Sequence, residues 1–357
     1  MATSTMIPCG DFKTTYAADT TIFPTVTSRN VLIVGIVLAC GAPFVLDNYS
    51  LSILIQIAYL SIAALGLNIL VGFTGQISIG HAAFFGFGAF SSAYLAEHWG
   101  VPVMLAIPLA GVMTTAVGMV FGIPAARLKG LYLAIATLAA QVILEDFFAR
   151  ADWFTGGVAG AMAATPTLFG FEFDNDQKYF YLALAYVVVM YIFATNLMRS
   201  RDGRALVAVR DHYLSAEMMG INLTKYRTMS FGIAAFYAGI GGALYAHYLQ
   251  FVSVEAITIL FSIQFLGMII IGGLGSIMGT LMGTAFMVLL PEVMTGLTDQ
   301  LAGTAIDRAL NLKDSIAYLR EMAIGAAIIL FLIFEPDGLA HRWKQIKAYW
   351  KLYPFSH

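Results

Sequence analysis

Long apolar runs separated by short polar stretches divide this chain. No Lys, Arg, Asp or Glu occurs from Asn48 to Ala96 or from His98 to Ala126, and Glu255 is the only one between Thr228 and Pro291. These runs exceed the ~20 apolar residues that a membrane-spanning helix needs. They are continuously apolar, whereas the strands of a membrane β-barrel alternate apolar and polar residues. The pattern therefore predicts an all-α protein that crosses a membrane several times.

The apolar runs define ten candidate spans, from which we expect about eight to ten transmembrane helices. The spans lie at about 31–46, 51–71, 81–96, 102–123, 130–149, 180–198, 228–250, 257–272, 276–291 and 321–334. Several are short for a hydrocarbon core about 30 Å thick. We therefore expect broken or re-entrant segments, above all at 81–96 and at the pair 257–272 and 276–291.

The polar segments between the spans carry opposite net charges on the two sides of a ten-span arrangement. With the N-terminus inside, the segments 1–30, 124–129, 199–227 and 335–357 hold 14 of the 19 Lys and Arg residues and 7 of the 21 Asp and Glu residues. The outside segments hold the rest, so the net charges are +7 inside and −9 outside. Because basic loops stay in the cytoplasm, this bias predicts that both termini are cytoplasmic.

Composition agrees with a membrane protein and divides the chain into three parts. Hydrophobic residues make up 59% of the sequence and charged residues only 11%, with a mean hydropathy of +0.80, whereas soluble domains are about 25% charged. We expect a polar cytoplasmic extension at 1–30, a transmembrane domain at 31–334 and a basic, aromatic cytoplasmic tail at 335–357. The tail is better suited to anionic lipid headgroups than to nucleic acid, because it directly follows the last span.

Two glycine-rich stretches interrupt the apolar pattern. Residues 71–90 read VGFTGQISIGHAAFFGFGAF, and residues 269–286 read IIIGGLGSIMGTLMGTAF. Small residues let helices approach closely, and Gly275, Gly279 and Gly283 recur at a spacing that predicts one helix face.

Alternatively, the polar groups and weakened helices of these two stretches line a translocation pathway. The candidate pathway residues are Gly72, Gly75, Gln76, Ser78, His81, Gly272, Gly273 and Gly275. For His81 the competing interpretation is a hydrogen-bonded residue that packs helices together.

The longest inside loop, 199–227, predicts a short amphipathic helix. Leu206, Val209, Tyr213, Ala216 and Met219 recur at three or four residues, as on one face of a helix, and Gly220 follows as a stop. The helix either rests on lipid headgroups or docks into a partner protein. In the docking interpretation, the coupling residues are Arg204, Arg210, Glu217 and Gly220.

Several kinds of chemistry have no motif in this sequence. There is no GxxxxGK[ST] phosphate-binding loop, no metal-ligand spacing and no set of nucleophile, base and orienting acid. Cys9 and Cys40 suggest neither a disulfide framework nor a metal site. Because the acids near spans, Glu145, Asp146 and Glu255, lie at expected outer ends, ion-coupled transport is also disfavoured. We expect a chain that is not an enzyme and binds no cofactor, and that draws on another polypeptide for energy.

The sequence resembles the permeases of high-affinity branched-chain amino-acid ABC importers, specifically the M-type subunit. The resemblance covers nearly the whole chain and is carried by NILVGFTGQISIGHAAFFGFGAF (68–90), RLKGLYLAIATLA (127–139), FTGGVAG (154–160), GRALVAVRDHYLSAEMMGIN (203–222), GALYAHY (242–248) and IGGLGSIMGT (271–280). It implies a bacterial inner-membrane protein with four kinds of partner. These are an H-type permease subunit, two cytoplasmic ATPases that bind ATP, a periplasmic amino-acid-binding protein and membrane lipid.

Two further expectations follow from the resemblance. The acidic outer loop 145–178, with Thr155, Gly156 and Gly157, is expected to contact the binding protein, although ordinary outer-loop acidity explains its charge equally well. The substrates are expected to be leucine, isoleucine and valine. Urea, short amides or other amino acids are the alternative within this class, and a passive channel is the alternative outside it.

Overall fold

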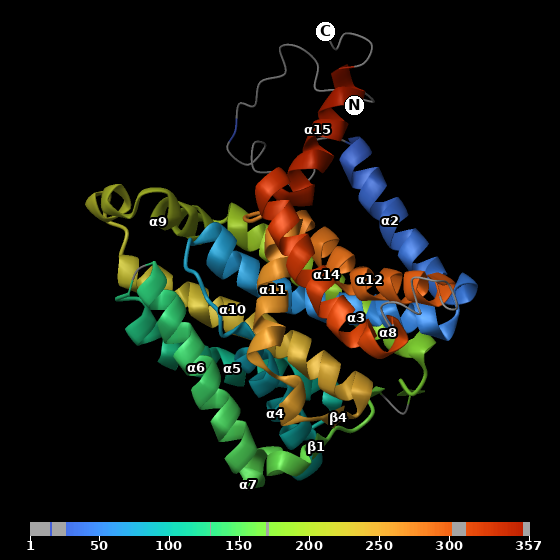
Figure 1. The fold of residues 1–357 in the computed structure, drawn as a ribbon. Helices are drawn as coiled ribbons and strands as arrows, with labels where there is room; N and C mark the ends of the chain where they lie inside the picture. The colour runs from blue at the N-terminus through green and yellow to red at the C-terminus, as the bar shows by residue number, and fades with distance from the viewer. Residues whose placement is uncertain (1–14, 16–25, 129, 169–170, 302–311, 353–357) are drawn as a thin grey trace.

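The computed structural model describes residues 15, 26–128, 130–168, 171–301 and 312–352. Helices make up nearly all of this part of the chain (Figure 1). The expected N-terminal extension at 1–30 lies largely outside the described residues, as do residues 353–357 of the expected tail.

The helices follow one another with short connections. In chain order they are α2 (Val26–Val45), α3 (Asn48–Asn68) continued by the π-helix η1 (Ile69–Phe73), α4 (His81–His98), α5 (Val103–Ala125), α6 (Leu131–Arg150), the one-turn α7 (Asp152–Thr155), the 3₁₀ turn η2 (Gly157–Ala159), α8 (Asp176–Arg199), α9 (Arg201–Met218), α10 (Leu223–Leu249), the 3₁₀ turn η3 (Val254–Ala256), α11 (Ile259–Gly272), α12 (Ile277–Leu301), α14 (Leu312–Phe334) and α15 (Gly338–Leu352). Each of the ten expected spans coincides with one of these helices.

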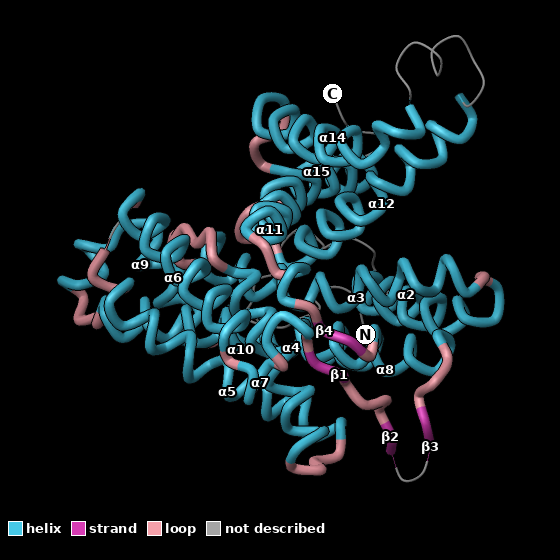
Figure 2. The backbone as a smooth tube through the Cα atoms, turned by 60° about the horizontal axis from the view of Figure 1, so that its bottom comes forward, coloured by secondary structure: helices cyan, strands magenta, loops and turns pink. Residues whose placement is uncertain are grey.

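Two small antiparallel sheets join the loops at one end of the helices (Figure 2). Strand β1 (Ala161–Met162) pairs with β4 (Phe251–Val252), and β2 (Thr167–Leu168) pairs with β3 (Phe171–Glu172). In Figure 1, α9, α15 and the start of α2 lie toward the upper end, whereas α7, β1 and β4 lie at the lower end. Helices α9 and α15 are thus on the side opposite α7 and β1, which is the relative placement that the charge pattern predicts for these segments.

Six helices in the described part of the chain are long and apolar enough to cross a membrane, or seven if α14 and α15 form one span bent by 50°. They are α3 with η1, α5, α6, α8, α10 and α12. The apolar part of α2 and the whole of α11 are shorter. Short and bent helices of this kind agree with the expectation that some segments are broken rather than complete crossings.

Helices α3 and α10 form the centre of the molecule. In their apolar windows 83% and 78% of residues are buried, compared with 28% in α8. Glycines let α10 pack closely against α4. If Gly88 of α4 carried a Cβ atom, that atom would lie only 2.3 Å from Gly239 Cα of α10. A Cβ atom on Gly242 of α10 would lie 1.9 Å from the Phe85 carbonyl oxygen of α4. Close backbone approach is the usual basis of helix packing in membranes.

The expected outer loop at 291–321 is largely helical, which corrects the sequence-based boundaries. Helix α12 continues past Pro291 to Leu301, and α14 begins at Leu312. Proline is tolerated in membrane helices because neighbouring groups satisfy the freed backbone. Glu292 therefore lies inside a candidate span, so ionisable side chains are not confined to the ends of spans in this protein.

Candidate functional site

The two glycine-rich stretches meet in space where two helices are interrupted. Residues 74–80 connect η1 to α4 without helical structure, and residues 273–276 form the turn between α11 and α12. A Cβ on Gly72 would lie 2.3 Å from the backbone nitrogen of Gly275, so only glycine allows this approach. The two stretches that hold the candidate pathway residues are therefore in direct contact.

The Asn68 side chain holds the turn between α11 and α12. Its Nδ2 donates to the Ser276 carbonyl (2.9 Å) and to the Thr280 hydroxyl (2.6 Å), and its Oδ1 accepts from the Gly275 N–H (2.9 Å). A fully satisfied buried amide of this kind fixes the orientation of the groups around it. Asn68 is not among the predicted site residues, although it begins the NILVGFTGQISIGH motif.

Gly275 itself lies in the turn rather than on the expected helix face, because α12 begins only at Ile277. Its φ of 74° is in the left-handed region that glycine adopts without strain. Gly279 and Gly283 do share a face and pack closely on α11: Cβ atoms there would lie 2.4 Å from the Gly272 carbonyl oxygen and 2.0 Å from that of Met268. The predicted packing face thus includes two of the three glycines.

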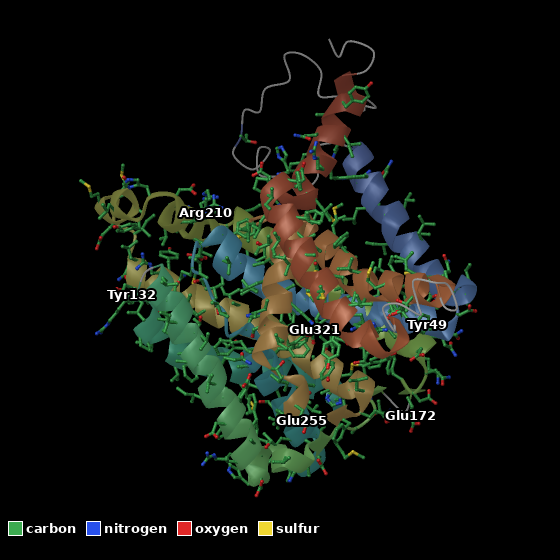
Figure 3. All side chains as sticks on the ribbon, in the orientation of Figure 1. Tyr49, Tyr132, Glu172, Arg210, Glu255 and Glu321 are labelled. Carbon is green, nitrogen blue, oxygen red and sulfur yellow. The ribbon has the colours of Figure 1, made fainter. Side chains whose placement is uncertain are left out.

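Arg210 connects α9 to both glycine segments. Its Nη1 donates to the Gly72 carbonyl (2.7 Å), and a Cβ on Gly75 would lie 2.9 Å from its Cγ. A Cβ on Gly275 would lie 3.3 Å from the same Nη1. Asp211 forms an ion pair with the guanidinium (2.8 Å). Figure 3 shows Arg210 on the α9 side of the molecule, where it bridges the predicted coupling and pathway residues.

Gln76 and Ser78 lie in the interrupted segment with their side chains buried. Gln76 Nε2 donates to the Ser230 hydroxyl of α10 (2.6 Å). Gln76 Oε1 and Ser78 Oγ have no hydrogen-bond partner among the described residues. Such atoms are rare in native proteins and usually indicate an ordered water or a functional role.

His81 begins α4 beside the middle of α3. Its Nε2 donates to the Ala63 carbonyl (2.8 Å), and its ring meets Phe265 of α11 edge-on, with 5.5 Å between ring centroids. Both contacts agree with the interpretation of His81 as a helix-packing residue. Because Ala63 is ten residues before the end of η1, α4 begins well inside the helical bundle rather than at its surface.

Side chains from two other helices satisfy the first backbone groups of α4. The Ala82 N–H donates to the Ser262 hydroxyl of α11 (2.9 Å), and the Ala83 N–H donates to Gln141 Oε1 of α6 (2.8 Å). A helix end inside a membrane needs such partners, since no bulk water reaches it. Gln141 and Ser262 were not predicted, because a lone polar residue in an apolar run does not reveal which neighbour it faces.

Helix α9 is amphipathic, but its exposed side is partly apolar. Leu206, Val209 and Ala216 are buried as expected. Met219 is instead 86% exposed, because α9 ends at Met218 and Met219 follows its last turn. The helix also bends at His212, whose φ and ψ are −154° and 87°. The exposed apolar side chains after this bend are Leu214, Met218 and Met219, which we call the α9 apolar patch.

The other predicted coupling residues lie around this patch. Glu217 is exposed beside Met218, and Gly220 ends the helix with a φ of 86° and no atom within 4 Å of an added Cβ. Arg204, on the first part of α9, donates to the Arg199 carbonyl (2.9 Å). Thus Arg204, Glu217 and Gly220 are all exposed, and Arg204 also donates a hydrogen bond to its own chain.

The predicted binding-protein contacts form a compact turn at the opposite end. Thr155 is buried, and its hydroxyl donates to the carbonyls of Phe148 (2.6 Å) and Ala151 (3.0 Å). Gly157 is also buried, with its N–H donating to the Thr155 hydroxyl (3.1 Å), while Gly156 is exposed. In the structure Thr155 and Gly157 shape the loop, and a contact with a partner remains a prediction for Gly156 and the exposed residues nearby.

Residues 49–332 match the family described as "Branched-chain amino acid transport system / permease component". The chain is 29% identical to the high-affinity branched-chain amino acid transport system permease protein LivM of Salmonella typhimurium, over 88% of this chain and 75% of the relative, and equally to the protein of that name from Escherichia coli. A probable branched-chain amino acid transport permease protein of Methanocaldococcus jannaschii is 26% identical, over 66% and 68%. No solved structure matches.

The family match covers most of the chain, including both glycine-rich stretches, α9 and every helix that is long enough to span a membrane. The helices and the match lead to the same conclusion. The protein is a multi-pass membrane protein that belongs to the family of permease components of branched-chain amino acid transport systems.

Proposed function

We propose that this chain is the M-type permease subunit of an ATP-driven importer that moves leucine, isoleucine and valine across the bacterial inner membrane. It is a transport subunit rather than an enzyme, and its ATP is bound by two separate cytoplasmic ATPases. An H-type permease completes the pathway, and a periplasmic protein delivers the amino acid. The family match and the LivM relatives support this assignment.

The contact of Arg210 with Gly72 is the observation that carries the mechanism. Helix α9 presents the α9 apolar patch to solvent on one side and reaches the interrupted helices through Arg210 on the other. A movement of α9 is therefore transmitted directly to η1 and to the turn at 273–276. We propose that closure of the two ATPases moves α9 and thereby changes the side from which the pathway is open.

The interrupted segments are suited to such a change. Their backbone does not form regular helix at 74–80 and 273–276, and Gln76 Oε1 and Ser78 Oγ have no partner among the residues described. Irregular backbone inside a membrane protein persists where it is enclosed by protein or lines a water-filled path. We propose that Gln76 and Ser78 contact water along the pathway, while His81 holds α4 against α3.

Co-purification tests the assignment against a passive channel. A tagged chain expressed with its neighbouring genes should retain an ATPase pair and a second permease in detergent. The cytoplasmic position of α9 is tested in sealed membranes, where a cysteine placed at Ser215 should react with impermeant reagents only from the cytoplasmic side. A chain that purifies alone and conducts solute without ATP would contradict the proposal. Ligand binding by the cognate periplasmic protein would separate branched-chain amino acids from urea or short amides.

A further inference from the structure

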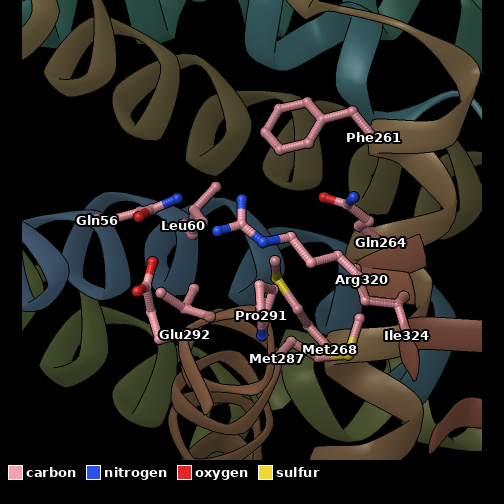
Figure 4. A pocket seen from close by; sticks show the side chains of 11 residues that line it. Gln56, Leu60, Phe261, Gln264, Met268, Met287, Pro291, Glu292, Arg320 and Ile324 are labelled. Carbon is pink, nitrogen blue, oxygen red and sulfur yellow. The ribbon is translucent and has the colours of Figure 1, made fainter. Parts of the chain in front are cut away.

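A cavity of about 220 Å³ lies between α3, α11, α12 and α14 (Figure 4). None of the eight predicted pathway residues lines it. Helix α11 separates it from His81, since Phe265 of that helix contacts His81 while Phe261 and Gln264 line the cavity. It is larger than the ~150 Å³ of an engineered protein cavity that holds benzene, so it can accommodate a small amino acid.

Two opposite charges face this cavity. Arg320 of α14 points across it toward Gln56 and Glu292, as Figure 4 shows. Within the described part of the chain, Arg320 and Glu292 form no ion pair with each other. Each is held by a neutral hydroxyl instead: Arg320 Nη2 donates to Thr295 (2.6 Å), and Tyr49 donates to Glu292.

Both side chains keep hydrogen-bonding capacity that their neighbours do not use. Arg320 Nε is buried and has no partner among the described residues. Glu292 accepts the Tyr49 hydrogen bond through Oε2, and no described residue donates to its Oε1. A buried guanidinium nitrogen without an acceptor is costly, so a ligand that supplies a carboxylate would be stabilised there.

Apolar side chains make up much of the remaining cavity wall, beside the neutral amides of Gln56 and Gln264. Leu60 of α3, Phe261 of α11 and Met287 of α12 line it. An α-amino acid with an aliphatic side chain carries one carboxylate, one ammonium and one apolar group, and the cavity has a counterpart for each. A single anion or cation would leave one of the two protein charges without a partner.

We propose that this cavity binds the zwitterion of an aliphatic amino acid, with Arg320 receiving the carboxylate and Glu292 the ammonium. The proposal rests on the proposed function and adds a substrate site outside the glycine-rich stretches. Charged side chains in membrane spans almost always face a water-filled cavity or other protein rather than lipid. Because Gln56 at the cavity edge is exposed in this chain, the second permease is expected to cover the opening.

Equilibrium binding to the whole complex in lipid nanodiscs, without the periplasmic protein, tests this site. The probe is radiolabelled leucine, with leucine amide and 4-methylpentanoate as competitors that lack the carboxylate and the ammonium charge, respectively. Arg320→Gln should weaken leucine binding by about tenfold to a hundredfold but leave leucine amide nearly unaffected, because it removes a charge-assisted hydrogen bond. Glu292→Gln should do the same with 4-methylpentanoate as the unaffected ligand.

Three comparisons keep the result interpretable. Glu321→Gln changes the exposed carboxylate next to Arg320 and should bind all ligands like the wild type. Arg320→Lys keeps the charge and should retain part of the leucine affinity, whereas loss of a purely structural role would weaken the binding of all three ligands equally.

If the wild-type complex takes up leucine but binds none in nanodiscs, or if the variants bind like the wild type, the site is overturned and the proposed function stands. If the wild-type complex takes up no branched-chain amino acid, the proposed function itself fails.

Discussion

The guanidinium of Arg210 lies where α9 meets two interrupted membrane helices, and its hydrogen bond to the Gly72 carbonyl joins α9 directly to the first of them. Gly72 in turn touches Gly275, and Asn68 holds the turn that contains Gly275. The sequence identified Arg210 and both glycines as candidates, because each lies in a family motif. It could not show that they touch, since they are 65 or more residues apart along the chain.

Replacing Arg210 by alanine should uncouple ATP hydrolysis from transport. The change removes a charge-assisted hydrogen bond worth about 1.5–3 kcal/mol, so ATP-driven uptake should fall by about tenfold or more while the complex still assembles. Uptake and ATPase activity of the same proteoliposomes measure the two effects. Arg127→Ala, an exposed arginine in the α5–α6 turn, is the matched control. Wild-type coupling in Arg210→Ala would remove this contact from the mechanism.

A methyl group at Gly72 should destabilise the protein itself. The Cβ of Gly72→Ala would lie 2.1 Å from Asn68 Oδ1 and 2.3 Å from the Gly275 nitrogen, so the two segments must separate. Overpacking of this kind costs about 1–3 kcal/mol and should lower the midpoint of thermal unfolding in detergent. Gly35→Ala in α2, where no atom lies within 4 Å, should not. Equal midpoints for the two variants would contradict the packing described here.

Among the elements, those with continuous apolar sequence were predictable, and those that depend on partners were not. Each expected span coincides with a helix, and the expected interruptions are found before α4 and between α11 and α12. The extension of α12 through Pro291 was missed because proline normally ends a helix, whereas neighbouring helices allow it in a membrane. The cavity beside α12 was missed for the same reason, since Glu292 and Arg320 were assigned to a loop.

The end of α9 gives a prediction about backbone conformation. Gly220 has a φ of 86°, which residues with a Cβ atom rarely adopt, and no atom lies within 4 Å of an added Cβ. A substitution there is therefore unfavourable because of the backbone conformation and not because of steric clashes with neighbours. Gly220→Val should cost roughly 1–2 kcal/mol and reduce coupled uptake, because α9 can no longer turn back toward α10 in the same way. Gly220→Asn should retain more activity, since asparagine tolerates this region. Equal uptake by the two variants would argue against a conformational role for Gly220.

The α9 apolar patch gives a prediction about assembly. Leu214 is 52% exposed and Met218 is 89% exposed, and burial of each side chain against an ATPase should contribute about 1.5–3 kcal/mol. The double variant Leu214→Gln, Met218→Gln should therefore lose most of its ATPase during purification. Leu131→Gln changes another exposed leucine, at the start of α6, and should keep the ATPase. If the double variant retained its ATPase fully, α9 would instead rest on lipid.

At the scale of the whole molecule, the chain combines a tightly packed centre with outer helices whose apolar windows are mostly not buried. Helices α3 and α10 bury most of their apolar windows, whereas α8 and α12 leave large parts of theirs on the surface of the chain. Counting charges predicted that α9 and the 145–178 loop lie on opposite sides of the membrane. The prediction was possible because each segment carries several charged residues, so that a single residue of the opposite sign does not reverse its net charge. The partner that covers each exposed face leaves no such signature in one sequence.

Uptake of radiolabelled leucine into proteoliposomes tests the central claim most directly. The purified complex is reconstituted with ATP enclosed on the ATPase side and the loaded binding protein on the other. We expect accumulation of leucine above the outside concentration with ATP, and none when the ATPases carry a substitution that abolishes hydrolysis. Leucine that only equilibrates across the membrane, at the same rate with and without ATP hydrolysis, would show a passive channel and contradict the account.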